Sequence, residues 1–104
     1  MELQDTDSSS EIILYEQLGL CKPGEGGRLI DEGRTEIGGD IPVNPSGGLL
    51  TCSEPTGASA IRQIAEITWQ LRGEAGSRQV PDPKAGLAQA SGAGGNCTVI
   101  ILKR

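Results

Sequence analysis

The segment that most constrains the fold is a nearly continuous apolar run at residues 97–102, with the sequence Cys-Thr-Val-Ile-Ile-Leu. A run of this length and composition is typical of a strand buried on both faces, which requires other layers to cover it. The chain has no Phe and only one Tyr and one Trp, so Ile, Leu, Val and Ala must build the core. We therefore expect a sheet in which residues 97–102 form a central strand.

A helix predicted at residues 58–72 would supply one covering layer. Its apolar side chains recur at the spacing of a buried helical stripe, which Ile67 and Trp69 widen. The members of this stripe are Ile61, Ile64, Ala65, Thr68 and Leu71. Gly73 is a typical C-cap signal. A second helix is predicted at residues 7–20, where the serines at 8–10 can cap its start.

The remaining segments complete an alternating pattern. Residues 85–89 read as a strand that a glycine-rich turn joins to the run at 97–102, and residues 43–51 read as a short strand interrupted by turn residues. Residues 22–42 read as a glycine-rich acidic loop. Together these segments predict an α/β fold with a mixed sheet and two main helices.

Charge and cysteine content exclude several classes of protein. Residues 1–40 hold ten acids and three bases, and residues 41–104 hold four acids and six bases, giving the net charge of −5. An acidic chain has no electrostatic reason to bind nucleic acid. The three cysteines are far apart and there is no His, which argues against a metal site. With a polar start and no long apolar run, we expect a cytoplasmic protein with reduced thiols and no membrane segment.

Three motifs occur in order before the glycine-rich turn and the final strand. They are Asn44-Pro45-Ser46-Gly47-Gly48, then Ser53-Glu54-Pro55-Thr56-Gly57-Ala58-Ser59, then Gln70-Leu71-Arg72-Gly73. This set resembles the C-terminal half of thiolases, above all the lipid-transfer (sterol-carrier) branch and its archaeal and bacterial relatives. The resemblance covers nearly all of residues 1–104, which it identifies as a partial thiolase-like domain that lacks the N-terminal half.

The resemblance implies a fold and a chemistry. Thiolases consist of two similar α/β halves packed around stacked helices, and they condense or cleave acyl-CoA thioesters without a further cofactor. The N-terminal half supplies a nucleophilic Cys. The C-terminal half supplies the His of a Gly-His-Pro motif, the Cys of a Cys-x-Gly motif, and an Asn or His that helps build an oxyanion hole. The implied partners are a second copy, a thiolase N-terminal half or an OB-fold companion.

This sequence departs from the thiolase pattern at each of these positions. Glu54 stands where the Gly-His-Pro motif has His, and its carboxylate would repel an enolate oxygen unless it were protonated. Gln4 stands at the oxyanion position, where its amide can still donate. Ala90 or Ser91 stands where the Cys-x-Gly cysteine belongs, and neither side chain is a useful base. Cys97 comes too late in the chain and is expected to be a core thiol.

Each candidate residue has a functional and a structural interpretation. Glu54 is either an acid or base, for instance in a retro-aldol step on a CoA ester, or a carboxylate favoured by the dipole at a helix N-terminus. Two groups of glycines either let the backbone approach a CoA ester or serve tight turns and close packing. These substrate-binding candidates are Gly47, Gly48, Gly92, Gly94 and Gly95.

Two hypotheses about function follow from the sequence. The first is an acyl-CoA-related domain of lipid metabolism without independent thiolase activity. It would be a fragment or subunit of an acyl-CoA acyltransferase or of a CoA-ester aldolase, with Glu54 and Gln4 as the nearest catalytic candidates. The second is a non-catalytic interaction module, a degenerate thiolase-like remnant that binds a partner protein.

Overall fold

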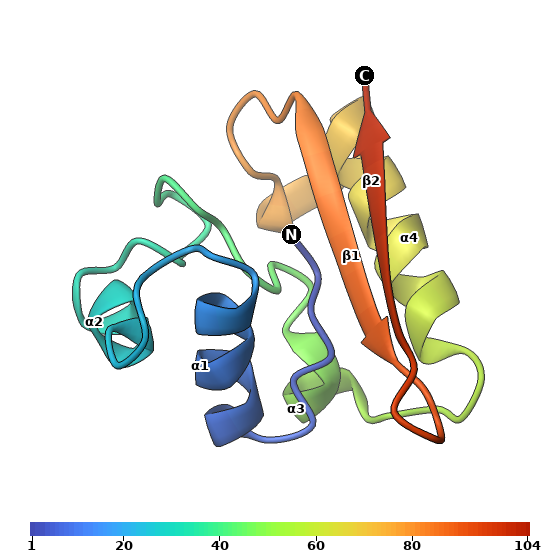
Figure 1. The fold of residues 1–104 in the computed structure, drawn as a ribbon. Helices are drawn as coiled ribbons and strands as arrows, with labels where there is room; N and C mark the ends of the chain where they lie inside the picture. Colours follow the sequence, from blue (N-terminus) through green and yellow to red (C-terminus); the bar gives the residue numbers. More distant parts are fainter.

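The fold is built on a hairpin with one long helix along its face (Figure 1). In the computed structural model, which describes residues 1–104, helix α4 (Ser59–Arg72) packs against strands β1 (Ala85–Ser91) and β2 (Cys97–Lys103). The strands are antiparallel, with Ala85 opposite Lys103 and Ser91 opposite Cys97. On the other edge of β1, Glu2 forms an isolated parallel bridge to Ala88, so parallel pairing is confined to this bridge and the sheet itself has two antiparallel strands.

Three shorter helices precede α4 in the chain, and the first two lie on the far side of the N-terminal segment from α4 (Figure 1). They are α1 (Ser8–Gln17), α2 (Gly26–Asp31) and α3 (Gly48–Cys52), and a 3-10 turn, η1 (Gly76–Arg78), follows α4. The core between these helices and β1 consists of Leu3, Tyr15, Leu29 and Val43. A second apolar cluster, of Ile67, Leu71 and Ala88, joins α4 to β1.

Helix α1 is confirmed, although its cap differs from the prediction. The N-cap is Asp7 rather than one of the three serines, because the Asp7 carboxylate accepts a hydrogen bond of 2.8 Å from the backbone N–H of Ser10. The Ser10 hydroxyl donates to the same carboxylate at 2.9 Å. The single Tyr, Tyr15, is buried on the inner face and donates from its hydroxyl to Glu11 at 2.7 Å.

Helix α4 has the predicted length and ends at Gly73, whose φ of +76° is the left-handed conformation of a C-cap. Its buried face matches the predicted apolar stripe only in part: Ile67 and Leu71 are buried and Ile64 packs against them. Ile61 and Trp69 are 68% and 45% exposed, and three polar side chains are buried in their place. These are Gln63, Glu66 and Gln70. Helix α4 therefore buries a mixed face of apolar and polar side chains and leaves Ile61 and Trp69 on its outer side.

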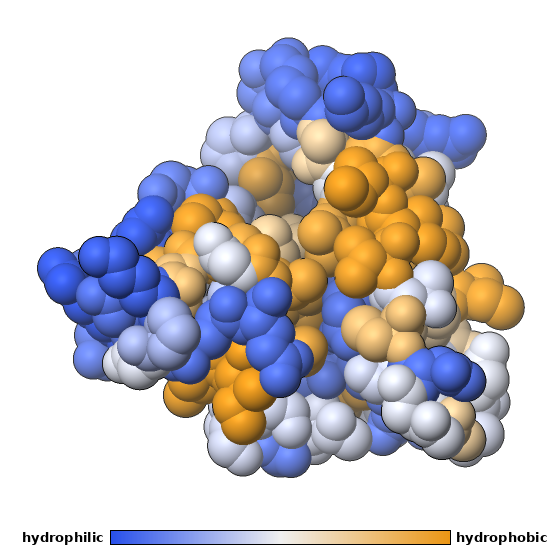
Figure 2. All heavy atoms as spheres, viewed as in Figure 1, coloured by the Kyte–Doolittle hydropathy of each residue, from blue (hydrophilic) through white to orange (hydrophobic).

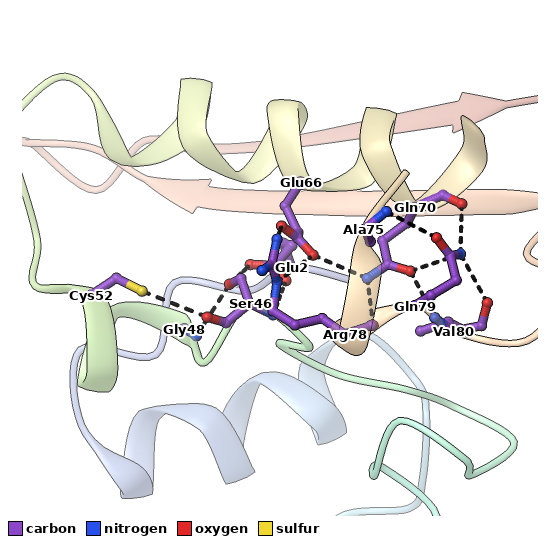
Figure 3. A network of polar contacts seen from close by, with 10 residues as sticks. All are labelled: Glu2, Ser46, Gly48, Cys52, Glu66, Gln70, Ala75, Arg78, Gln79 and Val80. Atoms are coloured by element: carbon purple, nitrogen blue, oxygen red, sulfur yellow. Dashed lines mark hydrogen bonds and ion pairs between the residues drawn. The ribbon is translucent and has the colours of Figure 1, made fainter. Parts of the chain in front are cut away.

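A hydrogen-bonded network pairs two of these three buried side chains, Glu66 and Gln70 (Figure 3). The Glu66 carboxylate accepts a 2.9 Å hydrogen bond from the guanidinium of Arg78, and Gln70 Nε2 donates to Glu66 at 3.0 Å. Gln70 Oε1 in turn accepts from the backbone N–H of Val80 at 2.8 Å. Because Glu66 and Gln70 have partners, the network holds the turn after α4 against the helix. Nε2 and Oε1 of the buried Gln63, in contrast, have no hydrogen-bond partner within the chain.

The predicted strand at residues 43–51 is wrong, because helix α3 begins at Gly48 within it. The Asp5 carboxylate accepts a 2.7 Å hydrogen bond from the backbone N–H of Leu49 and so holds the start of α3. This contact requires Gly48, because a Cβ there would lie 2.0 Å from Asp5 Oδ2. The segment 22–42 is likewise not wholly a loop, since it contains α2.

Strand β2 is an edge strand, so the expectation of a central strand buried on both faces is wrong. Val99 and Ile101 are 47% and 63% exposed. Both lie on the face opposite Leu102, the β2 residue that packs against the α4 cluster. Figure 2 shows an apolar patch over this face of the hairpin. Cys97 is exposed at the start of β2 and is therefore not a core thiol.

None of the helices has the length and apolarity that a membrane span requires. All three cysteines are free thiols, since the chain forms no disulfide.

Candidate functional site

The two residues predicted as catalytic candidates are in direct contact. Nε2 of Gln4 donates a hydrogen bond of 2.6 Å to Oε1 of Glu54. Both side chains line a cavity of about 340 Å³ between the start of α4 and the end of β1. The structure thus brings together Gln4, Glu54, Ala90 and Ser91, the residues that the resemblance to thiolases singled out.

Backbone elements on three sides position these groups. Gln4 follows the residues that pair with β1, and its Oε1 accepts a 2.5 Å hydrogen bond from the backbone N–H of Ser91. Its own backbone N–H donates to Oε1 of Gln89 at 3.1 Å. Gln4 is therefore tied to the end of β1 through both its backbone and its side chain, which leaves its amide pointing at Glu54.

Glu54 reaches the cavity from the exposed segment that joins α3 to α4. The preceding residue, Ser53, has a φ of +64°, which is uncommon for a residue with a side chain. Ser59, at the start of α4, donates from its hydroxyl to the carbonyl of Pro55 at 3.1 Å, which closes this segment into a turn. Glu54 lies five residues before Ser59, outside the first turn of α4, and its side chain lines the cavity.

The walls of the cavity are made mostly of small residues. Besides Gln4, Glu54 and Ser91 they are Thr56, Gly57, Ser59, Ala60, Ala90, Gly92 and Ala93. A volume of this size lies at the lower end of the range for small-molecule sites.

The predicted glycines divide into two groups. Gly92 lines the cavity, whereas Gly94 and Gly95 lie in the hairpin turn, each with a φ of +81°. Gly47 and Gly48 do not line it, because they pack against Thr51 and Asp5 at the start of α3. The structure therefore brings only Gly92 of this set to the carboxylate, and close packing accounts for the Gly47-Gly48 pair.

Two polar residues of this region were not predicted from the sequence. Gln89 is 1% exposed and joins Gln4 to Ser91, and Asp5 is 2% exposed and holds α3. A signal was present for Gln89, because it is the one large polar residue in a strand of otherwise small or apolar residues. No local pattern marks Asp5, since its partner lies 44 positions away.

Comparison with known proteins agrees with this fold and with the arrangement of the motifs. The family described as "Thiolase C-terminal domain-like" matches residues 1–104. The chain belongs to this family, whose description agrees with the resemblance drawn from the three motifs.

Two individual proteins are similar to this chain over nearly its whole length. The chain is 48% identical over 103 residues to sterol carrier protein 2 of Oryctolagus cuniculus, covering 99% of this chain and 19% of that protein. It is 49% identical over 105 residues to an acetyl-CoA acetyltransferase of Methanothermobacter thermautotrophicus, covering 100% of this chain and 27% of that protein. The chain thus spans about a fifth to a quarter of the length of these two relatives.

A solved structure shares the fold. The structure named "Ltp2-ChsH2(DUF35) aldolase" superimposes with a TM-score of 0.81 and 28% identity, covering 98% of this chain and 26% of that one. The relatives of this chain therefore include proteins named as an acyltransferase, a sterol carrier protein and an aldolase. Fold and family do not choose among these activities, so the choice must come from the residues of the cavity.

Proposed function

We propose that this chain is the C-terminal domain of an enzyme that cleaves or forms a carbon–carbon bond in CoA thioesters, with Glu54 as its acid–base group and without thiolase activity. The observation that carries this proposal is the 2.6 Å hydrogen bond from Gln4 to Glu54 at the wall of the cavity. It holds a carboxylate at the wall of this cavity, in the region that the resemblance to thiolases assigns to the reacting thioester.

The residue types at the site disfavour thiolase chemistry. Thiolases use an imidazole and a thiolate of this domain to stabilise an enolate and to move a proton near neutral pH. The chain contains no His, and the residues at the position of the thiolate are Ala90 and Ser91. Even if a partner supplied the nucleophilic Cys, this domain would not supply the imidazole or the thiolate that thiolase chemistry takes from it.

A retro-aldol reaction needs one acid–base group, and the Glu54 carboxylate can fill that role. The Glu54 carboxylate would take the proton of a β-hydroxyl group, and the O–H electron pair would form the new carbonyl as the Cα–Cβ bond breaks. The electrons of that bond would form the enolate of the shortened thioester. Glu54 would then return the proton to Cα, so the step needs no oxidant or reductant. The solved relative is named as an aldolase, which supports this class of reaction.

The exposed apolar faces support a larger assembly. Ile61 and Trp69 on α4, together with Val99 and Ile101 on β2, are all at least 45% exposed. Apolar side chains gathered on two faces are typical of surfaces that another domain or subunit covers. The proposed covering element is a thiolase N-terminal half, a second copy or an OB-fold companion. The proposed location is the cytoplasm, where three unpaired cysteines remain reduced.

The same exposed faces also favour a second candidate function, a non-catalytic interaction module. In that case Glu54 would only satisfy Gln4 and the start of α4, and the cavity would be a by-product of small side chains. Acyl transfer is the enzymatic alternative to carbon–carbon cleavage, because the archaeal relative is named as an acetyltransferase.

The experiment that tests the proposal measures cleavage of a β-hydroxyacyl-CoA by the complete protein with any subunits that copurify. Glu54→Gln keeps the size and the hydrogen-bond acceptor of the side chain but removes the base. We expect kcat to fall about 100-fold or more. The control Glu74→Gln changes an exposed acid outside the cavity and should leave kcat unchanged. Cleavage that survives Glu54→Gln would rule out Glu54 as the base, and no cleavage at all would favour the interaction module.

A further inference from the structure

The hydroxyl of Ser91 lies at the cavity in a defined orientation. Gln89 and Ser91 lie two residues apart on β1, so their side chains leave the same face of the strand. Nε2 of Gln89 donates a 3.0 Å hydrogen bond to the Ser91 hydroxyl oxygen. Ser91 also lines the cavity together with Glu54.

The direction of this hydrogen bond is fixed by the other end of the Gln89 amide. Oε1 of Gln89 accepts from the backbone N–H of Gln4 at 3.1 Å, so this oxygen faces a donor and the amino group must face Ser91. Gln89 is 1% exposed, which leaves it no water to exchange partners with. The same Nε2 lies 3.4 Å from the Cys97 sulfur.

One donor of Ser91 therefore remains unused. Its hydroxyl oxygen accepts from Gln89, and its backbone N–H donates to Gln4 Oε1 at 2.5 Å. A hydroxyl that accepts a hydrogen bond in this way still has its own hydrogen to donate. The hydroxyl of Ser91 has no acceptor within the chain, and the residue is exposed at the cavity.

We propose that Ser91 is a ligand-contacting residue that donates a hydrogen bond to the thioester carbonyl oxygen of the substrate, and that Gln89 is its positioning residue. This inference rests on the proposed function and specifies how the same cavity recognises its substrate. The donor of Ser91 and the acceptor of Glu54 suit a ligand with a carbonyl oxygen and a hydroxyl group close together, as in a β-hydroxyacyl thioester. Ser91 thus acts as a donor in place of the base that thiolases have in this region.

The test compares the binding of two CoA derivatives to the complete protein by calorimetry. One is an acyl-CoA thioester, and the other is the S-alkyl thioether of the same chain length, which lacks the carbonyl oxygen. The unmodified protein should bind the thioester roughly five- to tenfold more tightly, which is the contribution of one neutral hydrogen bond. Ser91→Ala should abolish this preference, and Ser91→Thr, which keeps a hydroxyl, should retain it.

The variant Gln89→Glu tests whether Gln89 orients the Ser91 hydroxyl or only stabilises the fold. It keeps an acceptor for Gln4 but turns the group facing Ser91 into an acceptor, so the Ser91 hydroxyl would donate to residue 89 instead of the ligand. The thioester preference should then disappear although Ser91 is intact. Gln89→Met, which cannot hold Ser91 in either direction, is the second variant should Gln89→Glu fail to fold, and it should weaken the preference.

Equal binding of the two ligands by the unmodified protein, binding of neither, or a preference that survives Ser91→Ala would overturn the inference. Failure of the proposed function has a different signature. In that case Glu54→Gln would leave cleavage unchanged while the thioester preference and its dependence on Ser91 could still be present.

Discussion

The side-chain amide of Gln4 donates a 2.6 Å hydrogen bond to the carboxylate of Glu54, 50 positions further along the chain. The same amide accepts a hydrogen bond from the backbone N–H of Ser91 at the end of β1. Gln4 thus joins the N-terminal segment, the loop before α4 and the hairpin at one point. The carboxylate of Glu54 depends on this amide for its orientation at the cavity.

This dependence predicts that Gln4 and Glu54 act as a unit. Gln4→Leu should lower kcat for cleavage of a β-hydroxyacyl-CoA by about tenfold, because the carboxylate loses its orientation. In a Glu54→Gln background the same change should have little further effect, since coupled residues are not additive. The control Gln17→Leu replaces an exposed Gln at the end of α1 and should leave kcat unchanged. Additive losses would show that Gln4 acts independently of Glu54.

Gly48 should be indispensable for stability rather than for substrate binding. Gly48→Ala would put a Cβ 2.0 Å from Asp5 Oδ2, and the residue has a φ of +65°. We expect it to lower the free energy of unfolding by about 2–5 kcal/mol, the sum of the backbone and overpacking terms. Gly76→Ala is the matched control, because its φ is +61° but no atom lies within 4 Å of the new Cβ. It should cost only about 1–2 kcal/mol. Similar losses in urea titrations of both variants would contradict this account.

The buried carboxylate of Glu66 should make Arg78 important for stability (Figure 3). The Glu66 side chain is 3% exposed and that of Arg78 is 42% exposed. Arg78→Ala should therefore destabilise the fold by about 1–3 kcal/mol, less than for a fully buried pair because water screens the arginine. Arg72→Ala breaks a 3.9 Å pair between exposed groups and should change stability by about 0.5 kcal/mol or less. Equal effects of the two variants would show that Glu66 is solvated.

Glu2 predicts a pH dependence of stability. Burial raises the pKa of Glu2 above its ordinary value of 4.5, although two hydrogen bonds from Ser46 oppose the shift. A raised pKa means that the folded state holds the proton more tightly than the unfolded state, so Glu2 reduces stability as the pH rises above about 4.5. Glu2→Gln removes this contribution.

The measurement is the free energy of unfolding of both proteins from pH 4 to pH 8. The difference between Glu2→Gln and the unmodified protein should move in favour of the variant as the pH rises through this range, and then level off. A difference that does not change with pH would show that Glu2 titrates alike in the folded and unfolded states.

Local patterns in the sequence were sufficient for the two long helices and the hairpin. The C-cap at Gly73 and the alternation of glycine-rich turns with apolar segments are local signals that need no tertiary contact. The start of α1 was predicted from the same kind of signal, although its cap is Asp7 and not one of the serines. The Gln4–Glu54 contact, in contrast, was reachable only through the resemblance to thiolases, which places both residues at one site.

The remaining features depend on contacts that no local pattern encodes. Helix α3 forms where a strand is predicted because Asp5 holds its first turn from 44 positions away. Helix α4 buries Glu66 because Arg78 and Gln70 surround it, which an apolar-stripe argument cannot anticipate. The apolar run of β2 indicates burial on both faces, but within this chain its outer face is uncovered.

The most direct test of the central claim is product analysis of two substrates given in parallel to the complete protein with its copurifying subunits. One is a β-hydroxyacyl-CoA, and the other is a 3-ketoacyl-CoA supplied with free CoA. The account predicts that the first yields a carbonyl compound and a shortened acyl-CoA in a reaction that Glu54→Gln abolishes, and that the second is not cleaved by thiolysis. Thiolysis of the 3-ketoacyl-CoA at a rate unaffected by Glu54→Gln would contradict the account.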